Sequence, residues 1–272
     1  MIIRAAAHYT LRPGSGEEAV VPGMELLPKP MARRMIAPVR RTMACALAAL
    51  AEAGIERPDA ICYGTGLGCL ADTREFLLEI ERNAGSLLAP TSFMRSTHNT
   101  VDGLIALALK AQGPNLTFSQ GFTSFHAALL AALMHLERRP GDRVLVGASD
   151  EHLPLLDHLF DALHGAAHVP AGARPAEGAA FFVLGGADGP VKGRVVDVRM
   201  GPADRVPVRD DAPVWTGALV PAAANGASYV HRTGLHHSAP AVAMALALAD
   251  AGPGVQLMDR EGEQHGLIHV AR

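Results

Sequence analysis

The chain is short of the residues that mark several common classes of protein. Three of its 272 residues are cysteines, Cys45, Cys62 and Cys69, and no two of them form a CxxC pair. An odd number of widely spaced cysteines argues against a disulfide framework and against a cysteine zinc site. Aromatic residues make up 4% of the chain and charged residues 19%, so most of its 49% hydrophobic content is aliphatic.

Basic residues are also too few and too scattered for a nucleic-acid surface. The formal net charge is −3, and the densest basic cluster, Arg33, Arg34, Arg40 and Arg41, has no interleaved aromatic residue. We therefore expect no nucleic-acid binding. The cluster is suited to dock an acidic protein partner, and it fits a solvated helix start equally well.

Long apolar runs and metal-binding motifs are missing as well. No apolar run approaches the roughly 18 residues of a membrane span, and the first residues lack the apolar core of a secretory signal, so we expect a cytoplasmic protein. The 13 histidines include no HExxH motif, and the spacing of His158 and His164 does not suit one ligand face of a helix. We expect neither a metal nor another cofactor.

The patterns that are present alternate between strand and helix. Helix patterns cover 43–53, 72–82, 100–110, 124–137 and 240–250, and strand patterns cover 60–64, 116–119, 143–148, 179–184, 190–199 and 266–271. Residues 165–178 and 201–214 have the composition of loops. Such alternation predicts a layered α/β fold. The Gly-rich stretch at 186–190 is the best internal boundary, which gives an N-terminal half, 1–186, and a shorter C-terminal half, 187–272, within one compact unit.

Two glycine-containing turns follow predicted strands. Residues 64–68 (GTGLG) fail the G-x-G-x-x-G spacing, so we interpret them as a structural turn and not as a nucleotide loop. Residues 119–124 (SQGFTS) lie between a short strand and a long apolar helix. A strand-to-helix elbow of this kind exposes one side chain at a helix N-terminus, where negative charge is stabilised.

These segments, in this order, resemble the β-ketoacyl synthases of the thiolase-like superfamily. The resemblance rests on the Ala-rich helix, GTGLG, NTVDGLIALA, GPNLTFSQGFTSFHAALLAAL, RVLVGASDE and AEGA with FFVL, and it spans residues 31–185. It implies a thiolase-like fold with α-β-α-β-α layers and a reduced C-terminal half. Residues 187–272 match the family weakly.

The resemblance places Phe122 where the family has its nucleophilic cysteine. A phenyl side chain cannot attack a thioester, and none of the three cysteines lies in the elbow. Thr123 and Ser124 are the neighbouring hydroxyls, and their alternatives are a nucleophile or a role at the helix N-terminus. The family's first histidine aligns with Asn225, and the second aligns with His236 or His237.

The compact length resembles the short subunits that pair with a full-length ketosynthase in aryl polyene and related type II polyketide pathways. The resemblance therefore implies a non-catalytic, chain-length-factor-like subunit that forms a heterodimer with a β-ketoacyl-ACP synthase and shapes its tunnel, with acyl carrier protein reached through the partner. The expected tunnel and interface residues are Leu116, Thr117, Phe118, Ser119, Gln120, Phe122, Phe125 and His126. The alternatives are an independent acyltransferase or hydrolase that uses Ser124 or Thr123, and a homodimeric scaffold for carrier protein.

Overall fold

The strand patterns of the sequence come together in one sheet. The computed structural model describes residues 1–12, 20–83, 88–162, 169–186, 188–220, 226–250, 252 and 254–272. In these residues ten strands form a continuous sheet with the order β3-β2-β4-β5-β1-β6-β10-β9-β7-β8.

The first part of the sheet is built from the N-terminal half of the chain. Its strands are β3 (Asn115–Phe118), β2 (Ala60–Gly64), β4 (Arg143–Asp150), β5 (Glu177–Gly185) and β1 (Ile2–Leu11). β2 pairs in parallel with β3 and β4, whereas β5 pairs antiparallel with β4 and β1. Every residue of β2 and β5 is buried, as expected for strands covered on both faces.

The second part of the sheet continues from β1. Its strands are β6 (Gly193–Gly201), β10 (Gln264–Ala271), β9 (Val255–Glu261), β7 (Val214–Thr216) and β8 (Gly226–Ser228). The first residues of β1 pair antiparallel with β6, so one strand joins the two parts. Buried Arg4 of β1 donates hydrogen bonds to the carbonyl oxygens of Gly185 and Gly189, at 3.0 and 2.8 Å, in the segment between β5 and β6.

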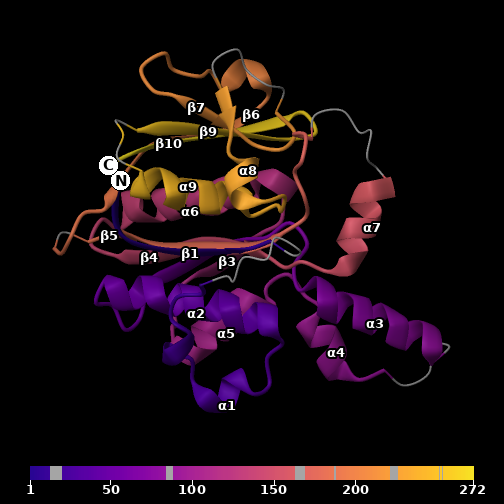
Figure 1. Cartoon of the computed structure of the whole chain (residues 1–272). Helices are drawn as coiled ribbons and strands as arrows, with labels where there is room; N and C mark the ends of the chain where they lie inside the picture. The colour runs from indigo at the N-terminus through magenta and orange to yellow at the C-terminus, as the bar shows by residue number, and fades with distance from the viewer. Residues whose placement is uncertain are drawn as a thin grey trace.

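Helices fill the space between the two parts of the sheet and cover one outer face. α6 (Ser124–Arg138) and α9 (Ala239–Ala249) lie between the parts, and α2 (Ala37–Glu52) and α5 (Thr100–Leu109) cover the outer face of the first part (Figure 1). The layers are therefore helix, sheet, helix, sheet. Among the described residues no α-helix covers the outer face of β6, where buried and exposed residues alternate. The fifth layer of the expected α-β-α-β-α order is therefore not seen on this face in the described residues.

The remaining elements are short or peripheral. α3 (Leu70–Arg82) and α4 (Pro90–Arg95) pack against each other at one side of the molecule (Figure 1). The other short helices are η1 (Met24–Leu26), α1 (Lys29–Ala32), η2 (Gly121–Thr123), α7 (Pro154–Ala162), η3 (Ala203–Arg205) and α8 (Val230–Thr233). No helix among the described residues has both the length and the apolar character that a membrane crossing requires.

The predicted α/β fold is confirmed, and the differences are the uncovered outer face of β6, several missed elements and the ends of others. α2 begins six residues before its predicted start, because Pro38 lies in the first turn, where a proline costs nothing. It ends at the predicted glycine, Gly54, which has a left-handed φ of 67°. The predicted loops 165–178 and 201–214 extend too far, since Glu177 already belongs to β5 and Val214 begins β7. The strands β7, β8 and β9 and the helices α4, α7 and α8 were missed.

Candidate functional site

The elbow lies between the end of β3 and the start of α6. β3 ends at Phe118, η2 spans Gly121–Thr123, and α6 begins at Ser124. Gly121 has a φ of 56°, a conformation that side chains rarely adopt, so a glycine makes the sharp turn here. The elbow predicted from the sequence is therefore present, with Phe122 at its centre.

Phe122 points into the protein and not into solvent. Its side chain is 8% exposed, and its ring centroid lies 4.5 Å from that of His237, with an angle of 40° between the ring planes. Its backbone N–H donates to Oε2 of Glu261 at 2.9 Å. The residue at the centre of the elbow is thus an apolar ring, and its backbone N–H group is already bonded.

The hydroxyls of Ser124 and Thr123 hold the elbow together. Ser124 Oγ accepts the N–H of Gln120 at 2.8 Å and lies within donating distance of the carbonyl oxygens of Gly121 (2.7 Å) and Thr65 (3.0 Å). Thr123 Oγ1 donates to the carbonyl oxygen of Gln120 at 2.9 Å. Both side chains are 1% exposed. In the described part of the chain no histidine hydrogen-bonds to either hydroxyl, so neither has a base to activate it.

The structure separates the two neighbouring histidines. His236 is buried against Gly178, and its ring nitrogens lie 2.8 Å from Ser238 Oγ and 3.2 Å from the carbonyl oxygen of Thr233. Burial lowers the pKa of His236 to about 3, so the ring is neutral. His237 is the one that reaches the elbow, where its ring packs on Phe122 and against Gly66.

Asn225, aligned with the family's first histidine, lies outside the described residues, and β8 begins directly after it. The described residues that follow β8 include Tyr229, whose hydroxyl belongs to a buried polar cluster. Tyr229 donates its hydroxyl proton to Oδ1 of buried Asp259, whose Oδ2 lies 3.5 Å from Nε2 of His126. Burial raises the pKa of Asp259 to about 8 and lowers that of His126 to about 3, which favours a neutral carboxyl beside a neutral ring.

The glycine turn at 64–68 binds a carboxylate of its own chain. Oδ1 of Asp150 accepts hydrogen bonds from Thr65 Oγ1 and from the N–H groups of Gly66 and Leu67, each at 2.9 Å. Asp150 is 3% exposed. The turn has the convergent N–H groups of an anion site, but a protein carboxylate fills it. This arrangement accords with the interpretation of residues 64–68 as a structural turn.

None of the three thiols lies in the elbow segment, and burial makes all three poor nucleophiles. All three cysteines are free and buried. Burial raises the pKa of Cys62 and Cys69 to about 12, and it raises that of Cys45 as well. A thiolate is the reactive form of cysteine, so none of the three is prepared to attack a thioester at neutral pH.

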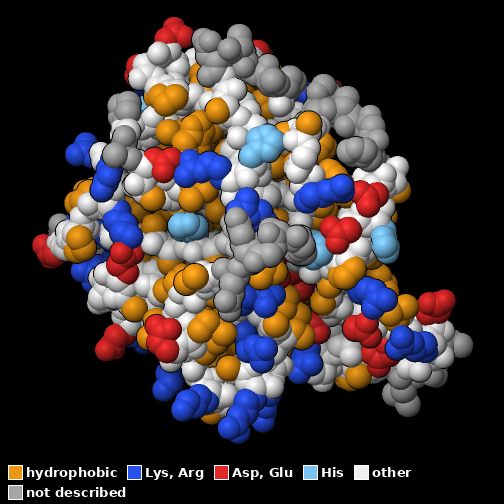
Figure 2. All heavy atoms as spheres, viewed as in Figure 1, with side chains coloured by type: hydrophobic (Ala, Val, Ile, Leu, Met, Phe, Trp, Pro, Cys, Tyr) orange, Lys and Arg blue, Asp and Glu red, His pale blue; other side chains and the backbone are white. Residues whose placement is uncertain are grey.

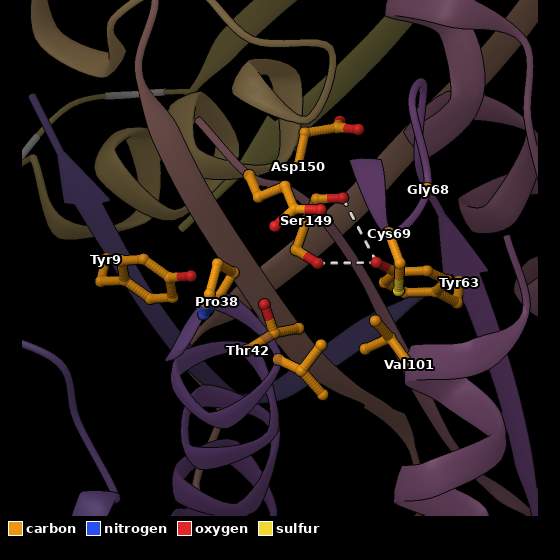
Figure 3. A pocket seen from close by; sticks show the side chains of 11 residues that line it. Tyr9, Pro38, Thr42, Tyr63, Gly68, Cys69, Val101, Ser149 and Asp150 are labelled. Carbon is orange, nitrogen blue, oxygen red and sulfur yellow. Dashed lines mark hydrogen bonds between the residues drawn. The ribbon is translucent and has the colours of Figure 1, made fainter. Parts of the chain in front are cut away.

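A small cavity beside the glycine turn is lined by polar side chains. It holds about 10 Å³, enough for one water molecule. The hydroxyls of Tyr9 and Tyr63 face each other across it, and Tyr63 hydrogen-bonds to Ser149 Oγ at 2.6 Å (Figure 3). Glu151 also lines it, and burial raises the pKa of Glu151 to about 7. The cavity is too small for an acyl group.

A larger groove lies on the other side of the elbow. It has a volume of about 560 Å³, and its mainly apolar wall runs from the end of β3 along α6 to β6 and the β9–β10 turn. The lining residues are Phe118, Gln120, Thr123, Ala127, Leu130, Ala131, Met134, Met200, Glu261 and Gln264. Its size suits an extended apolar ligand.

The predicted interface residues divide into exposed and buried ones. β3 is the edge strand of the sheet, Leu116 on it is 45% exposed, and Ser119 and Gln120 are also exposed. Thr117 is half-buried and donates to Asp102 at 2.7 Å. Phe118 is half-buried and lines the groove.

Phe125 and His126 differ from the other residues predicted for the tunnel or interface. Both side chains are fully buried within this single chain. Phe125 packs on Phe182 with 5.8 Å between ring centroids, and His126 lies against Gly266. The cause is the position of α6 between the two parts of the sheet, which leaves these residues no surface to offer a partner.

The predicted basic cluster is also divided. Arg33 and Arg34 are exposed, and basic side chains gather at the lower edge of the molecule in the view of Figure 2, where α1 lies. Arg41 instead forms two hydrogen bonds with the buried carboxylate of Glu177, at 2.5 and 2.7 Å. Its charge therefore serves the core and not a docking surface. Among the described residues no group of three or more His, Cys, Asp or Glu side chains is arranged to hold a metal ion.

Sequence reasoning missed the carboxylates at both turns, Asp150 and Glu261. Asp150 is the last residue of β4, which pairs with the strand that leads into the glycine turn. A carboxylate at that strand end could have been predicted to accept the N–H groups of the turn. Glu261 lies 139 residues from Phe122, at the end of the strand that was not predicted. No local pattern connects the two.

Comparisons with known proteins agree with this architecture. Residues 8–172, more than half of the chain, match the family model described as the β-ketoacyl synthase N-terminal domain. The search of curated proteins found no match. A β-ketoacyl synthase from Burkholderia phymatum STM815 has a similar structure, with a TM-score of 0.75, 13% identity and coverage of 100% of this chain and 98% of that one.

Two structures of paired ketosynthases are also similar. A structure of the ketosynthase ApeO with its chain length factor ApeC from Xenorhabdus doucetiae matches with a TM-score of 0.62 and 16% identity over 100% of both chains. The ishigamide ketosynthase/chain length factor matches with a TM-score of 0.67 and 18% identity over 99% of this chain and 98% of that chain. At these identities the likeness shows the fold, and together with the family model it leads to one conclusion: the chain belongs to the β-ketoacyl synthase family.

Proposed function

We propose that this chain is a non-catalytic, chain-length-factor-like subunit that forms a heterodimer with a true β-ketoacyl-ACP synthase. The observation that carries the proposal is Phe122 at the elbow, packed on His237, with no reactive thiol in the described residues. The family resemblance points to aryl polyene or related type II polyketide biosynthesis. The named pairs of ketosynthase and chain length factor among the similar structures support the same class.

The edge of the sheet supports a partner at β3. An edge strand presents unpaired backbone groups that another chain can extend. Leu116 on this strand is 45% exposed, and the groove of about 560 Å³ opens between β3, α6 and the β9–β10 turn. A partner that docks here would close the groove into a tunnel, and Phe122 would stand near its elbow end. Acyl carrier protein would reach the complex through the ketosynthase.

The first test is co-expression with a ketosynthase encoded beside this chain, with a tag on this chain alone. Copurification at equal stoichiometry supports the proposal. A stable homodimer of this chain that ignores any ketosynthase contradicts it and favours the scaffold alternative. Leu116→Arg tests the surface, and Leu155→Arg on α7 is the matched control, since Leu155 is 43% exposed. We expect the first variant to abolish copurification and the second to leave it unchanged.

The tunnel claim has its own test. Phe122→Gly and Phe122→Cys are introduced into the complex, and the products are sized by mass spectrometry. We expect product length to change, because the volume next to the groove changes, while this chain alone still makes no product. Unchanged products from both variants would remove the tunnel role and leave the partner role standing.

A further inference from the structure

The carboxylate of Glu261 lies directly on the elbow backbone. Glu261 is the last residue of β9, and the turn through Gly262 leads into β10. Its Oε2 accepts the N–H of Phe122 at 2.9 Å. A Cβ atom built on Gly121 would lie 2.0 Å from the same oxygen. Gly121 therefore does more than make the turn, because it leaves the space that the carboxylate occupies.

The N–H of Phe122 is the donor that an acyl group at the elbow would need. When a nucleophile attacks a thioester, the carbonyl oxygen becomes negative and must be met by fixed donors. The N–H of residue 122 is next to any reacting side chain at that position, and α6 adds the positive end of a 15-residue helix. A charged carboxylate holds such a donor more strongly than a neutral carbonyl oxygen does.

Glu261 also sets the charge at the elbow end of the groove. It lines the groove together with Gln120 and Thr123, whereas most of the remaining wall is apolar. An acyl chain in the groove would therefore meet a carboxylate where its thioester should lie. A thiolate formed at residue 122 would face a like charge, which raises the pKa of a thiol and lowers its reactivity.

We propose that Glu261 is an internal block that closes the elbow to acyl thioesters, separately from the missing cysteine. Phe122 removes the nucleophile, and Glu261 occupies the donor that would stabilise the oxyanion. Restoring a thiol is then insufficient to restore acyl transfer. The inference concerns the isolated chain, so it stands or falls without the proposed ketosynthase partner.

The test places a thiol at the elbow with Phe122→Cys and offers octanoyl-CoA. The thiol loses its proton, its sulfur attacks the carbonyl carbon, and a new carbon–sulfur bond forms. The bond to the sulfur of coenzyme A then breaks, and that sulfur takes up a proton. Intact-protein mass spectrometry follows the added acyl group. The chain with Phe122 in place gives the background from the three buried native cysteines.

Four variants separate the contributions of occupancy and charge. We expect slow acylation of Phe122→Cys and a rate at least about tenfold higher for Phe122→Cys with Glu261→Ala. Phe122→Cys with Glu261→Gln should fall between them, because the amide oxygen still accepts the N–H but carries no charge. Phe122→Cys with Glu263→Gln is the control, since Glu263 is exposed in the same hairpin, and it should match Phe122→Cys.

Equal acylation rates with Glu261 and with alanine would overturn the proposal, and so would a double variant that takes up no acyl group. A second measurement needs no introduced cysteine. Hydrogen–deuterium exchange at the amide of Phe122 should become about tenfold faster in Glu261→Ala and stay unchanged in Glu263→Ala. Unchanged exchange in Glu261→Ala would also overturn the proposal, because the carboxylate would then not hold this N–H.

Discussion

Two turns of this molecule offer backbone N–H groups to an anion, and the chain fills both with its own carboxylates in different ways. At the glycine turn, one oxygen of Asp150 receives three hydrogen bonds of 2.9 Å. At the elbow, one oxygen of Glu261 receives the N–H of Phe122 at 2.9 Å. Asp150 is 3% exposed and comes from the adjacent strand β4, whereas Glu261 is half-buried and comes from the other part of the sheet.

The two carboxylates therefore have different roles. Asp150 is part of the folded core, whereas Glu261 covers the elbow backbone from the edge of the groove. Asp150 completes the core, because its removal leaves three donors without their acceptor, one of them the fully buried hydroxyl of Thr65. Glu261 borders an open groove, so water can replace it at small cost. A turn that looks ready for a phosphate can therefore be structural, and an elbow that looks catalytic can be closed by a residue far away in the sequence.

The largest expected effect comes from removing each carboxylate and comparing the losses. Asp150→Ala leaves Thr65 Oγ1 and the N–H groups of Gly66 and Leu67 without their acceptor. We expect the free energy of unfolding to fall by about 3 kcal/mol or more, against about 1 kcal/mol for Glu261→Ala. Urea denaturation of both variants measures the difference. If Asp150→Ala and Glu261→Ala lost the same free energy of unfolding, the two carboxylates would not differ in their contribution to the core.

Asp259 is a third carboxyl to compare with Asp150 and Glu261. It receives a hydrogen bond from the hydroxyl of Tyr229 and not from backbone N–H groups. Burial raises the pKa of Asp259 to about 8, so the folded state keeps a proton that the unfolded state has lost. The stabilisation is complete at low pH and is lost as the pH rises through about 8. Between pH 6.5 and 8.5 this single group should remove about 2 kcal/mol.

Asp259→Asn should flatten this pH dependence, since an amide imitates the neutral carboxyl and does not titrate. The exposed Asp204→Asn is the matched control and should keep the slope. Urea denaturation from pH 6.5 to 8.5 gives both slopes. Glu151, whose pKa burial raises to about 7, contributes in the same direction to all variants. A slope that is equal in Asp259→Asn and in the unsubstituted chain would show that Asp259 is already ionised.

Ser124 connects the two turns, and its removal tests whether they are coupled. Its Oγ accepts the N–H of Gln120 in the elbow and lies 3.0 Å from the carbonyl oxygen of Thr65 in the glycine turn. Ser124→Ala should lower the free energy of unfolding by about 1.5 kcal/mol. In a double-mutant cycle with Glu261→Ala, a coupling energy below about 0.5 kcal/mol would mean that the elbow cover acts alone.

The parts of the fold that sequence reasoning found are those with local causes. The elbow was predicted because a strand, a glycine and a long apolar helix follow each other within 24 residues, from Asn115 to Arg138. The choice between His236 and His237 had no local solution, since the two are neighbours. Tertiary packing gives the two rings different surroundings, because Gly178 lies against His236 and Gly66 against His237.

The parts that sequence reasoning missed depend on contacts between the two halves. β9 carries polar residues at both faces of its end and reads poorly as a strand, yet pairing with β10 and β7 fixes it. That pairing brings Glu261 to the elbow. Phe125 and His126 were predicted at the tunnel or interface because of the family resemblance of this region, whereas α6 places both in the core of this chain, where they are fully buried.

The smallest expected effect is that of Glu261→Gln. This variant separates the contribution of the negative charge of Glu261 from the contribution of its hydrogen bond to the elbow. Glu261→Gln keeps an oxygen that can accept the N–H of Phe122 and removes the negative charge. Because Glu261 is half-buried at the edge of the groove, the attraction between its charge and the start of α6 is partly screened by solvent. We expect the free energy of unfolding to change by less than about 0.5 kcal/mol, measured by urea denaturation at low and high salt. A loss as large as that of Glu261→Ala would show that the charge holds the cover in place, and the elbow would then resemble the glycine turn more than it differs from it.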